Sequence, residues 1–336
     1  MASTNPTTRA GAVLLTTTVA SFLTAFMGSA LNIALPVIGK EFSMDAVTLG
    51  WVATSYTLAI AIFLVPFGRA ADIHGRRKVF TLGLLGYTVL TLALAFVASG
   101  TQLIALRVAQ GIASAAMFAT SSAILSSAYP PGERGRVLGI NVSAVYTGLA
   151  VGPFIGGIIT QNLGWRSVFI AGAAAGAVAV FAVLQLKDEW AEARGEPFDW
   201  IGAIIYGAAI AMAMYGLSRL PAWEGAVMLA AGLAGLAGFL AWANRAKAPI
   251  LNLSLFRNNR AFTLSSLAAL INYLATTAVT FLLSLYLQYL KGLTPQQAGA
   301  LLVAQPIMMA IFSPFAGRLS DRIESRIVAS VGMGLT

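Results

Sequence analysis

Two long apolar runs flank a short, highly charged segment, Gly68–Lys78, and this alternation strongly limits the folds open to the chain. The segment holds Asp72 and three successive cations, Arg76–Lys78. Charge at this density is costly in hydrocarbon, whereas apolar runs of about 20 residues are long enough to cross it. The segment is therefore predicted to be a tight turn between two membrane-spanning helices. A shorter version, Gly317–Arg322, recurs late in the chain, as an internal repeat would require.

Composition places these turns in an all-α membrane protein. Of the 336 residues, 58% are hydrophobic and 10% are charged, whereas about a quarter of the residues in a soluble domain are charged. Backbone polar groups in lipid must be paired within the segment itself, so each apolar run is predicted to be a helix. The predicted spans are 12–36, 46–67, 79–99, 101–128, 136–160, 166–186, 199–219, 224–243, 262–289 and 296–316, and an eleventh begins near 326.

Loop charge predicts which ends of the spans face the cytoplasm. Sixteen of the 21 basic residues fall in loops on the side of the N-terminus, among them Arg9 and Lys187, and four fall on the opposite side. Positively charged loops tend to stay in the cytoplasm, so the N-terminus is predicted to be cytoplasmic. Tryptophans near the predicted span ends agree with an interfacial belt. These are Trp51, Trp165, Trp200, Trp223 and Trp242.

The same composition argues against several other functions. The chain has no cysteine and one histidine, so disulfides, thiol chemistry and a histidine metal site are not expected. Its net charge of +9 lies in the short loops, where it orients the spans, and no nucleic-acid partner is expected. No cluster of catalytic side chains lies within a span. We therefore predict a transporter without cofactors rather than a membrane enzyme.

The charged turn has the pattern G-x-x-x-D-x-x-G-R-R-K, which resembles the signature loop between the second and third helices of the major facilitator superfamily. Ile73 stands where that loop usually has an arginine. Its two glycines permit close approach and a sharp reversal, and Asp72 can accept hydrogen bonds at a helix N-terminus or pair with a cation. We expect the turn and its echo to latch helices together. The predicted latch residues are Gly68, Asp72, Gly75, Arg76, Arg77, Gly317, Asp321 and Arg322.

The fourth predicted span contains Arg107, with Gln110 and Gly111 about one turn further on the same helix face. An arginine within a span costs about 2.5–3.5 kcal/mol on insertion scales, which makes it a candidate functional residue. The alternative is that its side chain reaches water at the span end. The stretch is similar to the superfamily's fourth-helix motif. That resemblance implies a role for Arg107 in proton coupling or substrate interaction, with Gln110 beside it.

The fifth predicted span carries small residues at four-residue spacing, together with a proline that removes a backbone hydrogen bond and kinks the helix. The combination resembles the antiporter motif found in exporters of the superfamily. The alternative is a general small-residue packing stripe. The motif residues are Gly148, Gly152, Pro153, Gly156 and Gly157.

The first predicted span ends in Asn32–Pro36, which looks like the first-helix motif of the fourteen-span drug:proton antiporters. Those proteins usually carry an aspartate where this chain has Met27. All 12 acidic residues fall in predicted loops or at span ends. Proton coupling is therefore expected to use Arg107 and its neighbours, a loop acid such as Asp72, or a residue beyond Thr336. Neutral or anionic amphipaths fit an embedded arginine at least as well as cations do.

The last predicted spans hold further polar candidates. By resemblance, Asn272 and Tyr273 line the cavity from the ninth span, and Gln305 with Pro306 combines a polar group with a helix break in the tenth. The alternative for each is a hydrogen bond between helices. The same alternative applies to Asn141, Tyr146 and Gln288. The seventh and eighth spans are almost wholly apolar, like the pair that the fourteen-span group inserts between its two halves.

These predictions divide the chain into three parts. Residues 1–190 form a six-helix transmembrane bundle, residues 191–260 form two linker helices and a connector, and residues 261–336 begin a second bundle. The resemblance implies two complete bundles, so we expect the sequence to be a part, cut at its C-terminal end, of a longer protein.

The function that these parts predict is proton-coupled export of amphipathic small molecules or drugs by alternating access. The expected partners are the substrate, protons and the lipid bilayer, and the expected state is a monomer in the inner membrane of a prokaryote. The alternative is a lipid-handling or non-drug major facilitator protein without proton antiport. Met27 and the absence of an acid at mid-membrane leave that alternative open.

Overall fold

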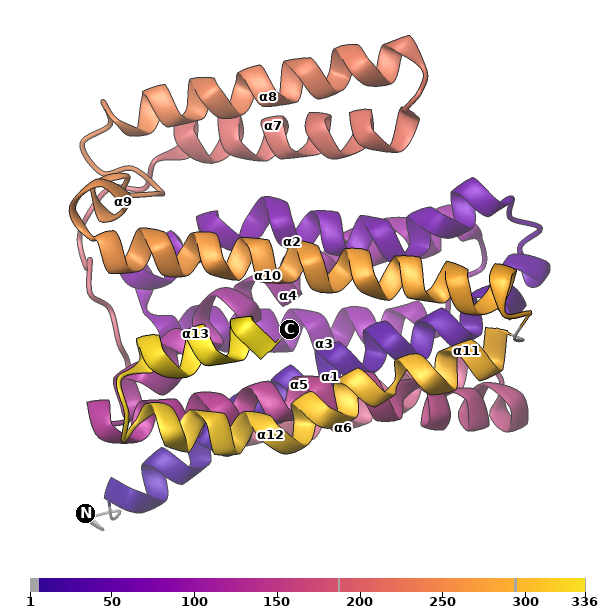
Figure 1. Ribbon diagram of the computed structural model, residues 1–336, viewed down its shortest axis with the longest axis horizontal. Coiled ribbons are helices and arrows are strands. Elements are labelled where there is room, and N and C mark those ends of the chain that lie inside the picture. The colour runs from indigo at the N-terminus through magenta and orange to yellow at the C-terminus, as the bar shows by residue number, and fades with distance from the viewer. Residues whose placement is uncertain (1–5, 187, 293–294, 336) are drawn as a thin grey trace.

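The computed structural model describes residues 6–186, 188–292 and 295–335, and every regular element among them is a helix (Figure 1). The predicted all-α fold is therefore confirmed for this part of the chain. Lys187 lies outside the described residues, as do the side chains of Arg9 and Gln288. Nine helical segments among the described residues are long and apolar enough to cross a membrane, the last of them, Gly299–Ser320, running through α11 and α12. They cover the first eight predicted spans and the tenth.

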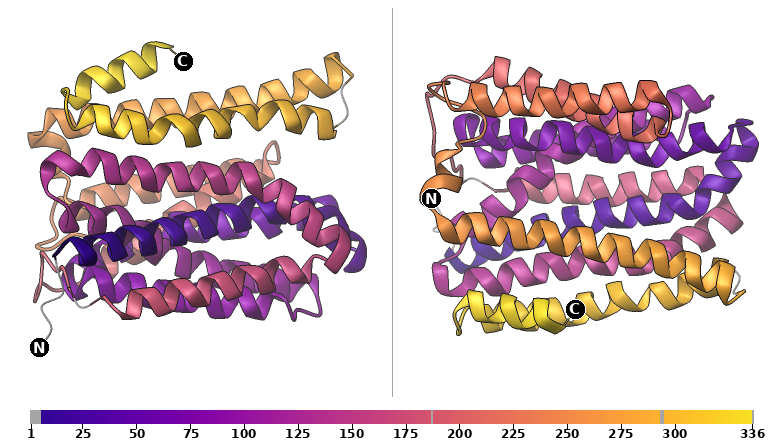
Figure 2. Two further views of the ribbon diagram at one scale, coloured as in Figure 1. Left: turned by 90° about the horizontal axis from the view of Figure 1, so that it is seen from below. Right: turned by 45° about the horizontal axis from the view of Figure 1, so that its top comes forward.

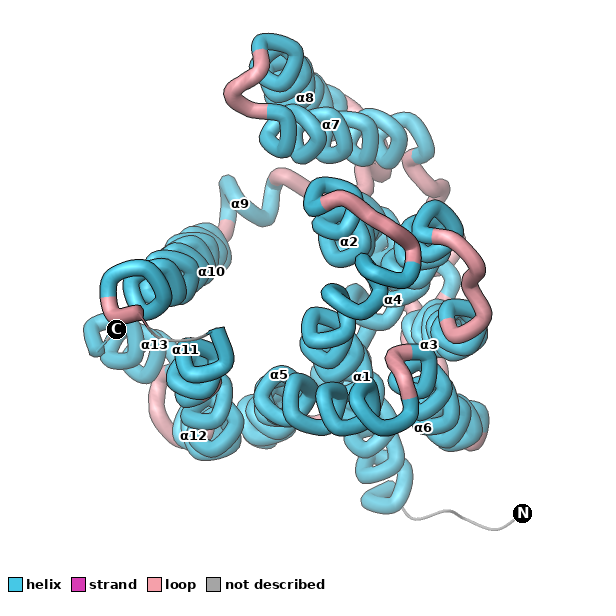
Figure 3. The backbone as a smooth tube through the Cα atoms, turned by 90° about the vertical axis from the view of Figure 1, so that its right-hand side faces the viewer, coloured by secondary structure: helices cyan, strands magenta, loops and turns pink. Residues whose placement is uncertain are grey.

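The first six helices pack into one bundle, in which α1 lies against α5 and α6, and α4 lies against α2 and α3 (Figure 3). Its core consists of apolar side chains that are almost fully buried, such as Leu31, Leu84 and Leu125. The helices are α1 (Pro6–Glu41), α2 (Ala46–His74), α3 (Arg76–Leu94), α4 (Gly100–Ala128), α5 (Pro131–Leu163) and α6 (Arg166–Leu184).

Two further helices, α7 (Trp200–Arg219) and α8 (Trp223–Ala243), form a hairpin on the outside of α2 (Figure 3). Asp199 caps α7 by accepting a hydrogen bond of 2.8 Å from the Gly202 N–H. The hairpin is fixed to the bundle by the Tyr206 hydroxyl, which donates to the Ala61 carbonyl at 3.1 Å. Its position is therefore peripheral, beside the first bundle.

The remaining helices run alongside the first bundle (Figure 2) and contact it chiefly through α12, which packs on α5. The predicted tenth span is two helices rather than one, with a break at Val303. Pro306 explains the break, because it has no N–H to donate to the Leu302 carbonyl. The elements are α9 (Ser254–Asn258), α10 (Arg260–Leu285), the π-helical turn η1 (Tyr286–Leu290), α11 (Pro295–Leu302), α12 (Ala304–Ser320) and α13 (Ser325–Leu335).

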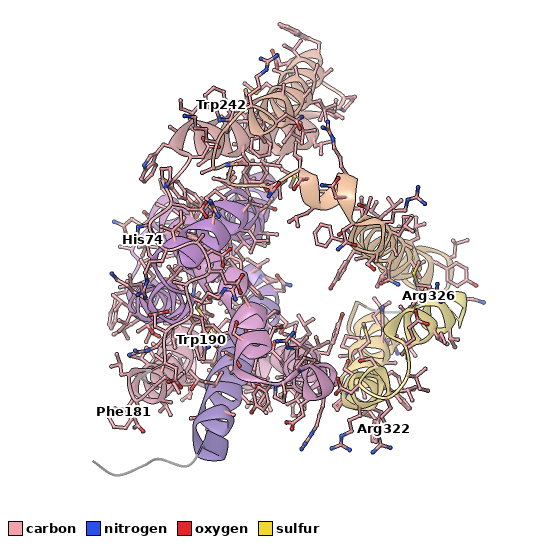
Figure 4. All side chains as sticks on the ribbon, turned by 90° about the vertical axis from the view of Figure 1, so that its left-hand side faces the viewer. His74, Phe181, Trp190, Trp242, Arg322 and Arg326 are labelled. Atoms are coloured by element: carbon pink, nitrogen blue, oxygen red, sulfur yellow. The ribbon has the colours of Figure 1, made fainter. Side chains whose placement is uncertain are left out.

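The connections α2–α3, α4–α5, α6–α7, α8–α9 and α12–α13 all lie at one end of the molecule (Figures 1 and 4). We call this the basic end, because most of the loop arginines and lysines are located there. Both copies of the repeated charged turn lie at this end, one in the first bundle and one at the end of α12. The topology thus brings the two copies to the same face of the protein.

Candidate functional site

The first copy of the turn reverses the chain at Gly75, whose φ of +113° is rarely adopted by residues with a side chain. Arg76 follows it and forms ion pairs of 2.8 Å with Asp72 and 2.8 Å with Glu192. One prediction for this turn is wrong: Gly68 lies inside α2, where a Cβ would meet no atom within 4 Å. It therefore takes no part in the reversal, because α2 continues as far as His74.

An acidic segment between α6 and α7 covers this turn, and we call residues 188–196 the acidic strap. The Glu189 carboxylate accepts hydrogen bonds from the backbone N–H groups of Arg77 at 2.9 Å and Lys78 at 3.2 Å. N–H groups in the first turn of a helix have no partner within the helix, so the Glu189 carboxylate acts as the cap of α3. Glu196 pairs with Arg69 at 2.5 Å. The strap thus neutralises the first copy of the turn.

The acidic strap is also held by backbone bonds to the turn. The Trp190 carbonyl accepts a 2.7 Å hydrogen bond from the Arg76 N–H, and the Ala193 N–H donates to the Asp72 carbonyl at 2.9 Å. The view onto the basic end shows Trp190 and His74 on the first bundle (Figure 4). Sequence analysis missed this docking. The available signal was the run of four acids in residues 188–196 and the cation cluster that it neutralises.

The second copy of the turn caps a helix of the first bundle. The Asp321 carboxylate accepts hydrogen bonds of 2.7 Å from both the Gly135 and the Arg136 backbone N–H groups, near the start of α5. A carboxylate at a helix N-terminus also interacts favourably with the helix dipole. Asp72 has no such role in the described structure, where its side chain pairs with Arg76. The two copies therefore form different contacts.

Small residues let α5 and α12 touch beside this cap. A Cβ on Gly317 would lie 3.0 Å from the Gly135 carbonyl carbon and 3.1 Å from Gly139 Cα, so both approaches require glycine. One turn further along α5, the Ser143 hydroxyl donates to the Ala310 carbonyl. Residues 135, 139 and 143 are four apart, a spacing that aligns small residues on one face. We call this contact, together with the Asp321 cap, the α5–α12 junction.

Arg107 lies inside the first bundle and is 2% exposed, so its side chain does not reach water. Its Nε donates to the Val52 carbonyl at 3.1 Å, and its Nη1 donates to Gln110 Oε1 at 2.6 Å. Gln110 in turn donates to the Thr91 hydroxyl at 2.7 Å. The network links α2, α3 and α4. Among the described residues, no carboxylate forms an ion pair with Arg107.

An aromatic ring completes the surroundings of this arginine. The Arg107 guanidinium lies 4.0 Å from the centroid of the Tyr56 ring, a distance at which cation–π attraction is strong. The Tyr56 hydroxyl lies 2.9 Å from that of Ser114. A Cβ on Gly111 would lie 2.5 Å from the Tyr56 carbonyl, so this glycine allows α2 and α4 to approach. Arg107, Gln110 and Tyr56 are thus each held by neighbouring groups.

The glycines of the predicted antiporter motif face α1. A Cβ on Gly148 would lie 2.7 Å from the Phe22 carbonyl, and one on Gly152 would lie 2.9 Å from the Phe26 carbonyl. Gly156 meets Ala30 in the same way. Gly157 differs, because its Cβ would lie 3.7 Å from the nearest atom, an ordinary contact. The stripe therefore brings α5 and α1 together, with Pro153 inside the same helix.

The other candidates are spread over the molecule. Asn32 is exposed on α1, Tyr273 is 66% exposed on α10, and Asn272 beside it is half-buried. Gln305 lies in the first turn of α12 and is exposed. Met27 is 1% exposed and packs on α6. The structure does not bring these residues together with Arg107 at one site.

A cavity of about 380 Å³ lies between α1 and α5, and sequence analysis missed it. Its wall carries hydroxyl groups and apolar side chains and no charge, and the Thr18 hydroxyl has no hydrogen-bond partner there. The lining residues are Thr18, Val19, Phe22, Ile140, Ser143, Ala144 and Thr147. The signal in the sequence was the run Thr16–Thr18 in the first predicted span.

Two groups in the loops have shifted pKa values. Hydrogen bonds from the side chain and the N–H of Thr48 lower the pKa of Asp45, which caps α2. The contribution of this cap to stability is thus present at neutral pH and is lost as the pH falls through the lowered value. Burial raises the pKa of the Tyr129 phenol, whose O–H donates to the Ala10 carbonyl at 2.7 Å. Both groups keep their usual protonation states at neutral pH.

A family model described as Major Facilitator Superfamily matches residues 17–336. The chain belongs to this superfamily. With its long apolar helices it is a multi-pass membrane protein, and it is a transporter rather than an enzyme. Solved structures agree on the fold. The proton:xylose symporter XylE matches with a TM-score of 0.64 at 12% identity, over 93% of this chain and 69% of that one.

Several curated members of the superfamily are similar in sequence. The riboflavin transporter RibZ of Clostridioides difficile is 31% identical over 92% of this chain and 68% of its own length. Multidrug resistance protein Stp of Mycobacterium tuberculosis is 30% identical over 90% of this chain and 57% of Stp. The tetracenomycin C resistance and export protein of Streptomyces glaucescens is 30% identical over 96% of this chain and 61% of its own length. The chain thus spans roughly three fifths to two thirds of these relatives' length.

Proposed function

We propose that this major facilitator protein exports amphipathic small molecules in exchange for protons and works by alternating access. The observation that carries the proposal is the α5–α12 junction. It consists of two N–H bonds to Asp321, glycine contacts and one hydroxyl bond, and among the described residues no ion pair joins the two helices. Alternating access needs a junction that can separate, because one bundle rocks against the other.

Loop charge supports the orientation. If the basic end faces the cytoplasm, as the positive-inside rule favours, the N-terminus is cytoplasmic and the Asp321 cap of the α5–α12 junction lies on that side. The peripheral position of α7 and α8 supports membership of the fourteen-span group, with residues 1–190 and 261–336 in separate bundles and residues 191–260 between them. We propose a monomer in a prokaryotic inner membrane.

The substrate class follows from the uncharged cavity between α1 and α5. A neutral amphipath can bury its apolar part against Phe22 and Ile140 and donate to hydroxyl oxygens of the wall such as that of Thr147. Arg107 lies outside that cavity, and its Nε and Nη1 donate to Val52 and Gln110. We propose that it acts in coupling and not as a direct ligand. Three relatives are named for riboflavin transport, multidrug resistance and tetracenomycin C export, which agrees with amphipathic cargo.

One observation favours the second candidate, a lipid-handling or non-drug transporter without proton antiport. Met27 occupies the position of the usual first-helix acid and is buried, so α1 offers no carboxylate for protons there. The two candidates differ in their energy source. The exporter depends on the proton gradient, whereas the second candidate does not.

Efflux measurements separate the two candidates. Cells that express the protein are loaded with a fluorescent neutral amphipath, and its loss is followed with and without a protonophore. The proposal expects efflux above that of control cells and its collapse when the protonophore is added. Efflux that persists without the gradient would favour the second candidate, and efflux no faster than in control cells would contradict export.

A further inference from the structure

A second cavity, of about 500 Å³, opens at the basic end between the first turn of α5 and the end of α12. Its lining is almost entirely charged. The residues are Gly132, Glu133, Arg136, Arg318, Asp321 and Arg322. We call it the arginine cavity. Arg322 is visible at the end of α12 in the view onto the basic end (Figure 4).

The charges of the arginine cavity are not balanced within the described part of the chain. No described carboxylate lies within ion-pair distance of Arg136, Arg318 or Arg322. Asp321 shares the cavity, but both of its oxygens accept backbone N–H bonds from α5. Three exposed arginines therefore line a space whose one uncommitted described acid is Glu133. The N-terminus of α5 adds its positive dipole end.

The two copies of the charged turn differ in whether their arginines form ion pairs. In the first copy, Arg76 pairs with Asp72 and Glu192, and Arg69 pairs with Glu196. The acidic strap thus supplies the anions from within the chain. In the second copy, nothing in the described structure takes the place of the strap. Arg318 and Arg322 face a cavity instead of carboxylates.

We propose that the arginine cavity binds a phosphate-bearing anion, which replaces the acidic strap at the second copy of the turn. Guanidinium groups bind phosphate through paired N–H bonds, and three arginines line this cavity. The volume of about 500 Å³ is within the range of small-molecule sites. The phosphate group can come from an anionic phospholipid headgroup or from a soluble phosphate, and the chemistry of recognition is the same.

The bound anion has a conformational consequence. Arg136 and Glu133 belong to α5, whereas Arg318 belongs to α12, so the walls of the cavity come from both sides of the α5–α12 junction. When the junction opens, these walls separate and the arginines no longer line one cavity. A ligand that binds one arrangement more tightly shifts the equilibrium toward it. The anion therefore stabilises the arrangement in which the α5–α12 junction is formed.

Thermal melting of the purified protein tests this inference and does not depend on transport. The protein is melted in detergent with added phosphatidylglycerol, with phosphatidylcholine, and with inorganic phosphate against chloride at equal ionic strength. We expect phosphatidylglycerol or phosphate to raise the melting temperature by several degrees, because a ligand of the folded state stabilises it. A shift with the lipid alone identifies a headgroup, and a shift with both identifies the phosphate itself.

Matched variants locate the site. Arg318→Gln and Arg322→Gln, singly and together, should remove most of the shift, whereas Arg245→Gln, an exposed arginine after α8, should keep it. If the double variant does not fold, the single variants and native mass spectrometry of bound lipid give the same comparison. The inference is overturned if no anion shifts the melting temperature, or if Arg318→Gln and Arg245→Gln reduce the shift equally.

Discussion

Asp321, at the end of α12, accepts a 2.7 Å hydrogen bond from the backbone N–H of Arg136, which lies 185 residues earlier in the chain, near the start of α5. This contact connects the second copy of the charged turn to the first bundle. Since the bond is to backbone, it depends on the position of α5 and not on the side chain of Arg136. The Asp321 carboxylate can therefore keep these hydrogen bonds only while α5 and α12 are in contact.

Replacing Asp321 with Ala should loosen the α5–α12 junction. The change removes both acceptors of the N–H bonds from α5, and comparable helix caps contribute about 0.5–2 kcal/mol, so the arrangement with the junction formed should lose about 2- to 30-fold in population. The chain has no native cysteine, so a single cysteine at Ser143→Cys reports opening through its alkylation rate. Glu224→Gln, on α8, is the control. Equal alkylation rates in the two variants would contradict a latch at Asp321.

Removing the carboxylate of Glu189 should destabilise the turn at Gly75. In Glu189→Ala, two N–H groups at the start of α3 lose their acceptor, a loss comparable to an N-cap substitution of about 0.5–2 kcal/mol. The melting temperature in detergent should fall by a few degrees, and the acidic strap should become more sensitive to protease. Glu224, in the first turn of α8, does not bond to the charged turn, so Glu224→Ala should leave both measurements unchanged. If the acidic strap in Glu189→Ala stays as resistant to protease as in the unsubstituted protein, contacts other than Glu189 hold the strap in place.

Arg107→Ala should abolish efflux while the protein still reaches the membrane. The substitution removes the donors to Val52 and Gln110 and the cation over Tyr56, and hydrogen bonds from charged groups contribute about 1.5–3 kcal/mol each. Arg107→Lys should restore the charge but not both bonds, so we expect only partial recovery. Efflux is measured at equal protein levels in the membrane. Normal efflux in Arg107→Ala would exclude a role for this residue in coupling.

Two glycines of α5 should respond differently to the same substitution. Gly152→Ala places a methyl group 2.9 Å from the Phe26 carbonyl, and overpacking of this kind costs about 1–3 kcal/mol. Gly157→Ala meets its nearest atom at 3.7 Å and should be tolerated. Melting curves of the two variants in detergent provide the comparison. Equal stability would mean that α1 and α5 are not packed as closely as described.

The span pattern could be predicted from sequence because hydropathy is a local property. The first eight helices and their order follow from apolar runs and charged turns. Gln305 with Pro306 predicted a helix break in the tenth span, and the break lies at Val303, three residues before the proline. Gly68 was assigned to the reversal, but α2 continues past it to His74.

The contacts of the candidate site depend on tertiary packing, which one sequence does not reveal. Asp72 and Asp321 occupy equivalent positions in the repeat, yet one pairs with Arg76 and the other caps α5. The difference arises from which helix each carboxylate faces. In the sequence the acidic strap is only a run of loop charge, since Glu189 of the strap lies more than a hundred residues from its partner Arg77. Arg107 and Gln110 were identified together because both lie on one helix.

The most direct test of alternating access is a reversible cross-link across the α5–α12 junction. Ser143→Cys and Ala310→Cys are introduced together, at the position where the Ser143 hydroxyl donates to the Ala310 carbonyl. Oxidation should join the two cysteines and stop efflux of the amphipath, and a reductant should restore it, while each single variant remains active under oxidation. Continued efflux with the cross-link formed would contradict opening of this junction during transport.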